Sequence, residues 1–408
     1  MEYNNSYSTS YILDKFDISR QTLYNWINAG LVMEPERDWR DWRVWTQQTL
    51  DEIENVITMK KDGVKADDTG IEKNLHINNR RYLGSKHKMV DFIKETIDNE
   101  FPKYKSFCDL FAGTGVVANA FNKKGVKVIV NDLLHSNYLS YMTWFYDGMY
   151  NSGKVNKLID DFNNIVPSND NYLSINFGNK YFSMENARKA GTIREHIDMI
   201  SDELTTKEKA MLITSLLYAL DKVANTCGHY DAYRKSAPEN QKLKLLYPSI
   251  KDSENKDNEV YKEDANKLVK SIKADVMYID TPYNSRQYAD AYHLLENIAE
   301  WKKPELEGVS MKYKNRSKIK SDYCTIKAPL AFSNLIENVD AKLIVVSYNN
   351  MAQKGNGRSN AKMSDEEIIE ALSRKGTVKT YETKHQYFTT GKATIEDHKE
   401  RLFVCKCK

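Results

Sequence analysis

The sequence predicts an α/β protein with a doubly wound, Rossmann-like sheet, an inserted helical region and a small helical module near its amino end. Two observations predict the sheet. Short apolar runs at Val126–Val130 and Ile272–Ile279 each lead to a polar residue, and a glycine-rich turn at Ala112–Gly115 joins another such run, Phe107–Phe111, to a helix-like segment. A separate helical pattern within residues 1–60 predicts the module.

The bulk composition excludes membrane and secreted classes. The chain has 408 residues, of which 41% are hydrophobic and 29% charged, enough for a substantial core in two or three domains. It contains no run of eighteen apolar residues, and its first residues form neither a basic leader nor an apolar signal, which predicts a cytoplasmic protein. The five cysteines include no C-x-x-C pair, so we expect reduced thiols and no metal site.

The first 60 residues are expected to form a helical module that reads DNA. Ser19 is a suitable N-cap, and Leu23 and Trp26 recur at helical spacing behind it. A helix of this kind can enter a major groove with its first side chains on base edges. The side chains expected near the helix start and on its outer face include Arg20, Gln21 and Tyr24.

The pattern "ISRQTLYNWINAGLV", followed by a charged segment with "WRVW", resembles the MerR-type winged helix-turn-helix. The resemblance implies that Gly30 ends the recognition helix and that Arg40 and Arg43 lie on the wing beside phosphates. The wing is richer in tryptophan than that family, which favours packing there, and a protein-interaction role is the alternative for the module. Residues 61–78 are predicted to be a linker, because this stretch is mostly polar and lacks periodicity.

The first half of the predicted sheet is a strand at Phe107–Phe111, a helix at Val116–Lys123 and a second parallel strand at Val126–Val130. In such sheets, ligands bind outside the carboxyl ends of the strands. Asp132 follows the second strand, where a carboxylate can accept both hydroxyls of a ribose.

The glycine turn favours S-adenosylmethionine over a nicotinamide cofactor. Phe111, Gly113 and Gly115 form an F-x-G-x-G turn without the third glycine of the dinucleotide fingerprint. The sulfonium and amino-acid ends of S-adenosylmethionine need no pyrophosphate cradle, and Asp109 is expected to face the amino-acid end. Ordinary capping and solvation is the alternative for Asp109 and Asp132.

Asp280 ends the strand at Ile272–Ile279 and so is expected at the same edge of the sheet. Together with "RYLGSK" and "DLFAGTG", the stretch "DTPY" resembles the Dam-like alpha group of adenine-specific DNA methyltransferases. The resemblance implies that the Asp280 carboxylate and the Thr281 carbonyl accept the two hydrogens of an adenine amine, which frees its lone pair for in-line attack on a methyl group. Pro282 would stiffen the turn, and Tyr283 would stack on a base flipped out of the duplex.

The same resemblance assigns further residues. Tyr82 and Lys86 of "RYLGSK" fall on cofactor-contacting positions, and Asp264 falls on the acid that contacts the adenine of the cofactor. An N-cap to the following helix is an alternative for Asp264, and both roles can hold. The family usually has proline where this chain has Thr281, but the group required there is a main-chain oxygen.

Residues 79–135 and 261–408 are expected to form the catalytic domain, and residues 136–260 an inserted, mostly helical region that recognises the target. DNA-binding candidates there and in the basic run "MKYKNRSKIK" are His229, Tyr230, Arg234, Lys235, Lys312, Lys314 and Arg316. The alternatives are an aromatic cluster for the first four and a solvated basic loop for the last three. The end of the chain is expected to close the sheet with an antiparallel hairpin.

These motifs predict a site-specific DNA adenine methyltransferase that uses S-adenosylmethionine and base flipping. The resemblance implies double-stranded DNA as partner, a restriction-modification system and a possible cognate restriction endonuclease. Two alternatives come from other classes. A MerR-like regulator with a degenerate methylase body is opposed by intact Asp280, Pro282 and Tyr283, and an RNA methyltransferase is opposed by the helix-turn-helix pattern, whose geometry suits B-form grooves.

Overall fold

The computed structural model describes residues 7–28, 32, 35, 43–61, 74–236, 238, 241–250, 257–283, 285–314, 316–349, 362–384 and 399–408. The chain divides into two compact units, Met1–Leu75 and His76–Lys408. None of the helices in the described ranges is long and apolar enough to cross a membrane.

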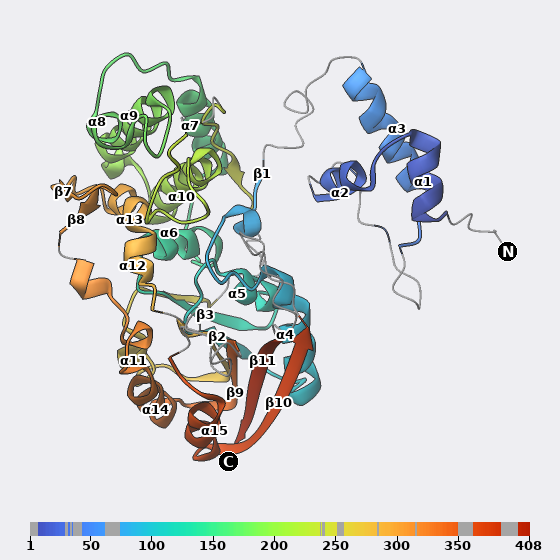
Figure 1. Cartoon of the computed structure of the whole chain (residues 1–408), viewed down its shortest axis with the longest axis vertical. Coiled ribbons are helices and arrows are strands. Elements are labelled where there is room, and N and C mark those ends of the chain that lie inside the picture. The colour runs from blue at the N-terminus through green and yellow to red at the C-terminus, as the bar shows by residue number, and fades with distance from the viewer. Residues whose placement is uncertain are drawn as a thin grey trace. The chain divides into compact units, whose positions relative to one another are not determined.

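The amino-terminal unit is built on three helices, α1 (Thr9–Phe16), α2 (Arg20–Asn28) and α3 (Gln47–Lys61), followed by strand β1 (Asn74–Leu75) (Figure 1). The predicted cap of α2 is confirmed, because Ser19 Oγ accepts a hydrogen bond from the Thr22 amide at 3.0 Å. The helices enclose a small core, whose buried members are Ile12, Leu23, Trp26, Val32, Trp45, Leu50, Ile53 and Val56.

The expected wing is only partly within the described residues. Gly30 and Arg40 lie outside them, and the side chains of Gln21 and Tyr24 are not described. Trp45 is fully buried and donates from Nε1 to Thr9 Oγ1 at 3.0 Å, so this tryptophan packs in the core of the unit. The predicted winged helix-turn-helix therefore stays a prediction.

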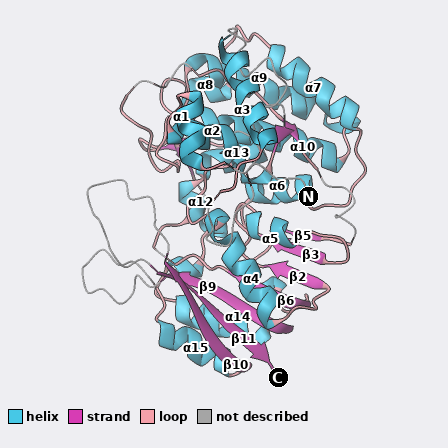
Figure 2. Ribbon diagram, turned by 90° about the vertical axis from the view of Figure 1, so that its right-hand side faces the viewer, coloured by secondary structure: helices cyan, strands magenta, loops and turns pink. Residues whose placement is uncertain are grey.

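A seven-stranded sheet forms the base of the main unit (Figure 2). The strands, in their order across the sheet, are β10 (Gly376–Lys384), β11 (Lys399–Cys407), β9 (Ala341–Asn349), β6 (Ala274–Ile279), β2 (Ser106–Asp109), β3 (Lys127–Asn131) and β5 (Glu259–Tyr261). The five strands from β9 to β5 run parallel, while β11 is antiparallel to both of its neighbours. The predicted parallel sheet with a closing antiparallel hairpin is confirmed.

Strand β5 is a correction to the sequence analysis, which kept residues 136–260 out of the sheet. Val260 pairs with Val130 at the edge beside β3, and the preceding Asn258 accepts a hydrogen bond from the Val128 amide at 2.8 Å. This strand is short and only half-buried, so its residues carry no apolar run that would mark a strand.

Short helices cover both faces of the sheet. On one side α11 (Ala265–Leu268), α14 (Ala328–Asn338) and α15 (Asp365–Ser373) pack on buried residues of β6 and β9. The remaining elements near the sheet are η2 (Ile77–Asn79), η3 (His87–Met89), α4 (Val90–Glu100) and α5 (Val116–Phe121). Phe121 of α5 stacks on Phe107 of β2 with ring centroids 3.9 Å apart, which fixes the helix that follows the glycine turn.

A helical part packs at the other end of the main unit, as Figure 1 shows for α6 to α10. Its elements are α6 (His135–Trp144), α7 (Ser152–Asn164), α8 (Tyr172–Phe177), α9 (Met184–Met199), η4 (Ser201–Glu203), α10 (Thr206–Val223), β4 (Tyr247–Pro248), α12 (Tyr288–Ala291), α13 (His293–Glu300), β7 (Leu306–Glu307), β8 (Lys312–Tyr313) and η6 (Arg316–Ile319). The short η7 (Asp322–Cys324) packs instead in the core that α14 shares with the sheet. Leu294 and Leu295 of α13 share one core with Leu212 and Leu216 of α10. The helical part therefore uses residues from both sides of the "DTPY" stretch, and its packing does not end at residue 260.

Candidate active site

The carboxyl ends of β2, β3 and β6 bring three of the predicted acids to one edge of the sheet. Asp109 ends β2, Asp132 follows β3 and Asp280 follows β6. Parallel pairing places Asp109 beside both Val130 and Tyr278, so the three strands end at nearly the same level. A cavity of about 620 Å³ lies at this edge.

The cavity collects most of the residues that the sequence predicted for cofactor and target. Its lining includes Tyr82, Lys86, Asp109, Phe111, Gly113, Asp132, Asp264, Asp280 and Pro282. Gly115, Thr281 and Tyr283 are their neighbours in the chain but do not line it. Five separate stretches of the sequence thus converge on one cavity, as expected of a site formed at strand ends.

The glycine turn between β2 and α5 needs its glycines. Gly113 and Gly115 have φ values of 52° and 78°, a region that side chains rarely adopt. A Cβ at Gly113 would lie 3.1 Å from the Tyr82 ring, and the carbonyl of Gly113 accepts a hydrogen bond of 2.6 Å from the Tyr141 hydroxyl. The turn is therefore held closely between two tyrosines.

Asp132 is fixed by main-chain donors. Its carboxylate accepts hydrogen bonds from the amides of Leu134 at 2.8 Å and Gly113 at 3.1 Å, the second of which ties it to the glycine turn. Burial raises the pKa of Asp132, although these hydrogen bonds oppose the shift. Neighbouring Asn131 bonds to both the amide and the carbonyl of Glu263, which fixes the segment that leads to Asp264.

Asp109 offers an acceptor to the cavity. The side chain is 1% exposed, and Oδ2 accepts a hydrogen bond from the Ala118 amide at 3.2 Å. Oδ1 is buried without a hydrogen-bond partner in the described part of the chain, and burial raises the pKa of this carboxyl. A buried acceptor without a partner at a cavity wall fits a ligand with N–H donors, such as the amino-acid end of S-adenosylmethionine.

Asp264 combines the two roles that the sequence left open. Its side chain caps α11 by accepting a hydrogen bond from the Lys267 amide at 3.1 Å, and the residue also lines the cavity. The N-cap reading is confirmed, and the contact with the cofactor adenine stays a prediction.

Asp280 lies beside a buried ammonium group. Lys86 Nζ is 3.2 Å from Asp280 Oδ1 and 3.5 Å from Glu400 Oε1, and Lys86 and Glu400 are 4% and 0% exposed. Burial raises the pKa of Asp280 to about 6, with Lys86 lowering it and Glu400 raising it. Lys86 thus contacts the predicted catalytic acid, a neighbour that the sequence did not indicate.

The residues after Asp280 form a buried turn. Thr281 is 1% exposed, and its hydroxyl has no hydrogen-bond partner within the described ranges. Tyr283 packs edge-on against Tyr348 of β9, with ring centroids 6.5 Å apart, and the Lys86 ammonium lies 5.9 Å from its ring centroid. The Tyr283 ring therefore lies next to the Lys86–Asp280 ion pair.

Two tyrosines that the sequence analysis missed attach the "RYLGSK" loop to the helical part. Tyr292 stacks on Tyr82 with ring centroids 4.5 Å apart, and its hydroxyl accepts a hydrogen bond from the Leu83 amide at 2.7 Å. Tyr288 donates to the Leu83 carbonyl at 3.2 Å. Their helical spacing in "YADAYHLL" gave a usable signal, because residues four apart share one helix face.

Comparison with known proteins identifies the class. Residues 82–353 match the family described as D12 class N6 adenine-specific DNA methyltransferase. The chain belongs to this family.

The methyltransferase is also similar to curated relatives. It is 38% identical over 290 residues to modification methylase StsI from Streptococcus sanguinis, covering 66% of this chain and 44% of that protein. It is 31% identical over 330 residues to type II methyltransferase M.NlaIII from Neisseria lactamica, covering 78% of this chain and 95% of that protein. With M.FokI from Planomicrobium okeanokoites it shares 32% identity over 330 residues, covering 74% of this chain and 48% of that protein. The methyltransferase thus spans about half the length of two of these relatives and nearly all of the third.

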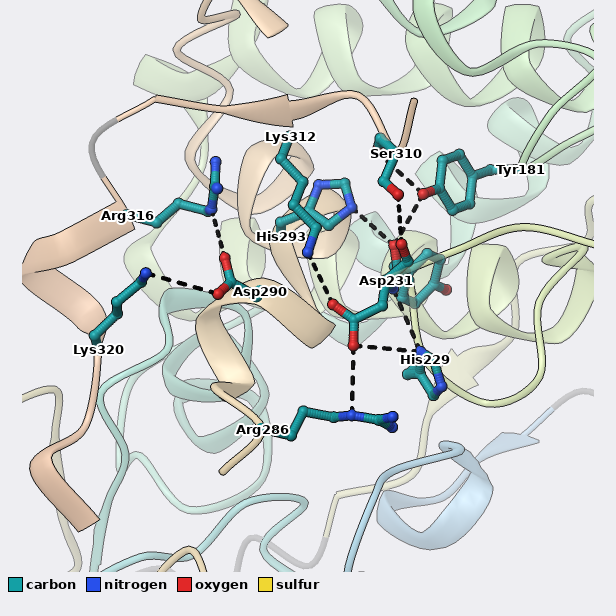
Figure 3. A network of polar contacts seen from close by, with 11 residues as sticks. Tyr181, His229, Asp231, Arg286, Asp290, His293, Ser310, Lys312, Arg316 and Lys320 are labelled. Atoms are coloured by element: carbon teal, nitrogen blue, oxygen red, sulfur yellow. Dashed lines mark hydrogen bonds and ion pairs between the residues drawn. The ribbon is translucent and has the colours of Figure 1, made fainter. Parts of the chain in front are cut away.

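Several predicted DNA-binding side chains of the methyltransferase form a charged network in the helical part (Figure 3). Asp231 lies at its centre, with Lys312 Nζ at 2.9 Å, Arg286 Nε at 3.5 Å and His229 Nδ1 at 3.7 Å from its carboxylate. Burial lowers the pKa of His229, so this imidazole is neutral at pH 7. The two cations, Lys312 and Arg286, come from separate segments of the chain and meet at one acid.

A second acid extends the network in Figure 3. Asp290 of α12 accepts a hydrogen bond from Arg316 Nε at 2.7 Å and lies 3.8 Å from Lys320 Nζ. Basic residues thus outnumber acids here, which suits a polyanionic partner. The sequence analysis named Lys312 and Arg316 but missed Arg286, which lies three residues after the "DTPY" stretch.

The other predicted DNA-binding residues are placed differently. Tyr230 is fully buried and donates to Asp221 at 2.9 Å, so its side chain packs in the core and is not available to DNA. Aromatic residues in a polar loop give no sign of which way each ring points, and the prediction for Tyr230 was wrong for that reason.

The other candidates in the main unit, Arg234, Lys235 and Lys314, are exposed. In the amino-terminal unit Arg20 is exposed and Arg43 is half-buried.

The cavity shows no sign of a metal centre. No group of three or more histidine, cysteine, aspartate or glutamate side chains that could hold a metal ion occurs among the described residues.

Proposed function

We propose that this protein is a site-specific DNA adenine methyltransferase. It would transfer a methyl group from S-adenosylmethionine to the exocyclic amine of an adenine flipped from duplex DNA. The observation that carries this proposal is the half-buried Asp280 carboxylate in the same cavity as Asp109 and Asp132. S-Adenosylmethionine supplies an electrophilic methyl group, and the residues of this chain bind it, orient the amine and exclude water.

Each acid has a separate part in the proposed reaction. Asp132 would accept hydrogen bonds from the ribose hydroxyls and Asp109 from the amino-acid end, which would bind S-adenosylmethionine in the cavity that Asp280 also lines. Asp280 and the Thr281 carbonyl would accept the two hydrogens of the adenine amine, which localises the nitrogen lone pair. As positive charge develops on that nitrogen, the Asp280 carboxylate stabilises it in a site with little water.

The proposal extends to the biological setting. The relatives are named as modification methylases and type II methyltransferases, which supports the modification half of a restriction-modification system with a cognate endonuclease. The order of "RYLGSK", "DLFAGTG" and "DTPY" along the chain supports placement in the Dam-like alpha group. Genomic DNA as substrate implies an enzyme that acts in the cytoplasm.

The direct test uses the full chain and plasmid DNA that lacks adenine methylation. Labelled methyl groups should pass from S-adenosylmethionine to the DNA, and digestion should release N6-methyladenine. Long-read sequencing of the product should then give the recognition sequence as a single motif. Methylation of RNA alone, or no methyl transfer, would refute the proposed function.

The charged network suggests that Asp231 competes with DNA phosphates for its cations. Replacing Asp231 with asparagine should therefore raise the affinity for non-specific DNA about two- to fivefold, since an ion pair that solvent still reaches, as this half-buried one is, is worth roughly 0.2–1 kcal/mol. Fluorescence anisotropy at several salt concentrations would measure it. Asp161→Asn is the matched control, because it removes the same charge from an exposed pair with Lys157 on α7. A lower affinity in Asp231→Asn than in that control would contradict the prediction.

The amino-terminal unit is proposed to be a MerR-like module that contributes to DNA binding. Deleting residues 1–70 should leave S-adenosylmethionine affinity unchanged, because every residue assigned to the cofactor lies in the main unit. Affinity for DNA should fall, and each lost phosphate contact should reduce the slope of log affinity against log salt by about 0.9.

Single changes in that unit should separate two kinds of contact. Arg20→Ala should weaken binding to the cognate site more than to random DNA, whereas Arg43→Ala should weaken both alike. Full activity with the full salt slope after the deletion would instead assign the module to promoter regulation or to a protein partner.

A further inference from the structure

Glu400 stands out because it is a fully buried carboxylate beside the catalytic centre. It is 0% exposed, and its Oε1 lies 3.5 Å from the Lys86 ammonium, which in turn lies 3.2 Å from Asp280. The three charged groups come from a loop, from the turn after β6 and from β11. Strand β11 lies outside residues 82–353, the part of the chain that matches the family.

The position of β11 explains how Glu400 reaches the site. This strand lies between β9 and β10, and Glu400 pairs with Asn349 on one side and Thr383 on the other. Successive side chains on a strand point to opposite faces of the sheet. The next residue, Arg401, accordingly forms an ion pair with Asp365 of α15 on the opposite face, whereas Glu400 contacts Lys86.

Burying a carboxylate at the position of Glu400 costs free energy of folding. Burying a charge requires a partner of opposite sign, and apolar residues of similar volume are often more stable in such positions. The residues that follow on β11, Leu402, Phe403 and Val404, are apolar and buried. The stability of the fold therefore does not explain why a glutamate occupies this position. Its contact with Lys86, the ion-pair partner of Asp280, does.

We propose that Glu400 is a positioning residue for methyl transfer, which draws the Lys86 ammonium away from Asp280 so that this carboxylate stays a strong acceptor for the adenine amine. The inference rests on the proposed function. With Glu400 present, one ammonium is shared between two carboxylates and the cluster carries a net negative charge. Without it, Lys86 would neutralise Asp280, and the positive charge that develops on the amine would have no counterion.

The proposal has a signature in the pH dependence of the rate. Other titratable groups that interact with Asp280 are Asp109, Tyr278, Tyr283 and Tyr288. Burial raises the pKa of each of these. Among the charged neighbours, Glu400 raises the pKa of Asp280 and Lys86 lowers it. Loss of the Glu400 charge should therefore move the acid limb of the rate profile to lower pH, although the plateau rate falls.

The test compares wild type with Glu400→Gln in the full chain. Glutamine keeps the size of the glutamate side chain and removes its charge. We expect kcat to fall roughly tenfold, less than for a group that contacts the amine itself. The KM values for DNA and for S-adenosylmethionine should change little, and the acid limb should shift to lower pH. Glu400→Asp keeps the charge and should return the limb toward its wild-type position with partial recovery of kcat.

Asp365→Asn is the matched structural control. It breaks the ion pair of Arg401 on the opposite face of the same strand, so it weakens β11 without touching Lys86. It should lower thermal stability and leave the acid limb in place.

Three outcomes overturn or redirect the inference. An unchanged kcat in Glu400→Gln overturns it. A slower Glu400→Gln enzyme with an unmoved acid limb and a stability loss like that of Asp365→Asn also overturns it, since the role would then be structural. If wild type itself transfers no methyl group to DNA, the proposed function fails instead, and that result is distinguishable from the first two.

Discussion

Replacing Asp280 with alanine should lower kcat for DNA methylation at least about a hundredfold, the cost of removing one preorganised charge-stabilising group. The reason is geometric and electrostatic. Asp280 lines the cavity at the end of β6 and lies 3.2 Å from Lys86. In the variant, one acceptor for the amine is lost and the Lys86 ammonium faces the developing positive charge. Single-turnover transfer of labelled methyl groups would measure the effect.

The control for this variant is Asp280→Asn, which keeps the shape of the side chain. Because the pKa of Asp280 is raised to about 6, the folded protein binds its proton more tightly than the unfolded chain does, and the ionised group opposes folding above that pH. The asparagine variant should therefore be inactive and at least as stable as wild type at neutral pH. For wild type, the ionised acceptor predominates above about pH 6, and the rate should fall as pH drops through that value. Near-normal turnover in either variant would refute the role of Asp280.

Replacing Asp132 with alanine should weaken binding of S-adenosylmethionine strongly. Two charge-assisted hydrogen bonds to the ribose would be lost, each worth roughly 1.5–3 kcal/mol. The amides of Gly113 and Leu134 would also lose their acceptor, so the glycine turn itself would be less ordered. Isothermal titration calorimetry with the full chain would report the affinity.

Two comparisons separate these contributions to cofactor binding. Asp132→Asn keeps an acceptor for the turn and removes the charge, so it should bind S-adenosylmethionine more tightly than the alanine variant but less tightly than wild type. Asp170→Ala removes an acid from a surface pair with Arg188 and should leave affinity unchanged. Wild-type affinity in Asp132→Ala would mean that the ribose binds elsewhere.

Two of the strand ends could be predicted from the sequence because an apolar run stops at a polar residue. Asp132 and Asp280 were placed at one sheet edge on that rule, whereas Asp109 was expected inside a strand that ended two residues later; all three line one cavity. The closing hairpin was also predictable, since both of its strands are long and the second contains the apolar run Leu402–Cys405. Local polarity patterns of this kind predict where strands lie and where they end.

Glu400 could not be predicted in the same way. Its contact with Lys86 depends on which strands lie beside β11 and on their register, and neither is written in the local pattern. The "KERLFVC" stretch shows only that charged residues precede an apolar strand. Strand β5 was missed because a three-residue edge strand has too few positions for a period to emerge.

The segment from Asp280 to Tyr288 connects two separately packed bodies within the main unit. Its first residue follows a strand of the sheet, while its last begins α12 and packs against the core that α10 and α13 share. A shift of the helical part on binding a duplex would act on these few residues, which include those proposed to hold the target amine. A non-cognate DNA site would then slow the chemical step as well as weaken binding. Discrimination between DNA sequences would therefore be measured more fully by kcat/KM than by Kd.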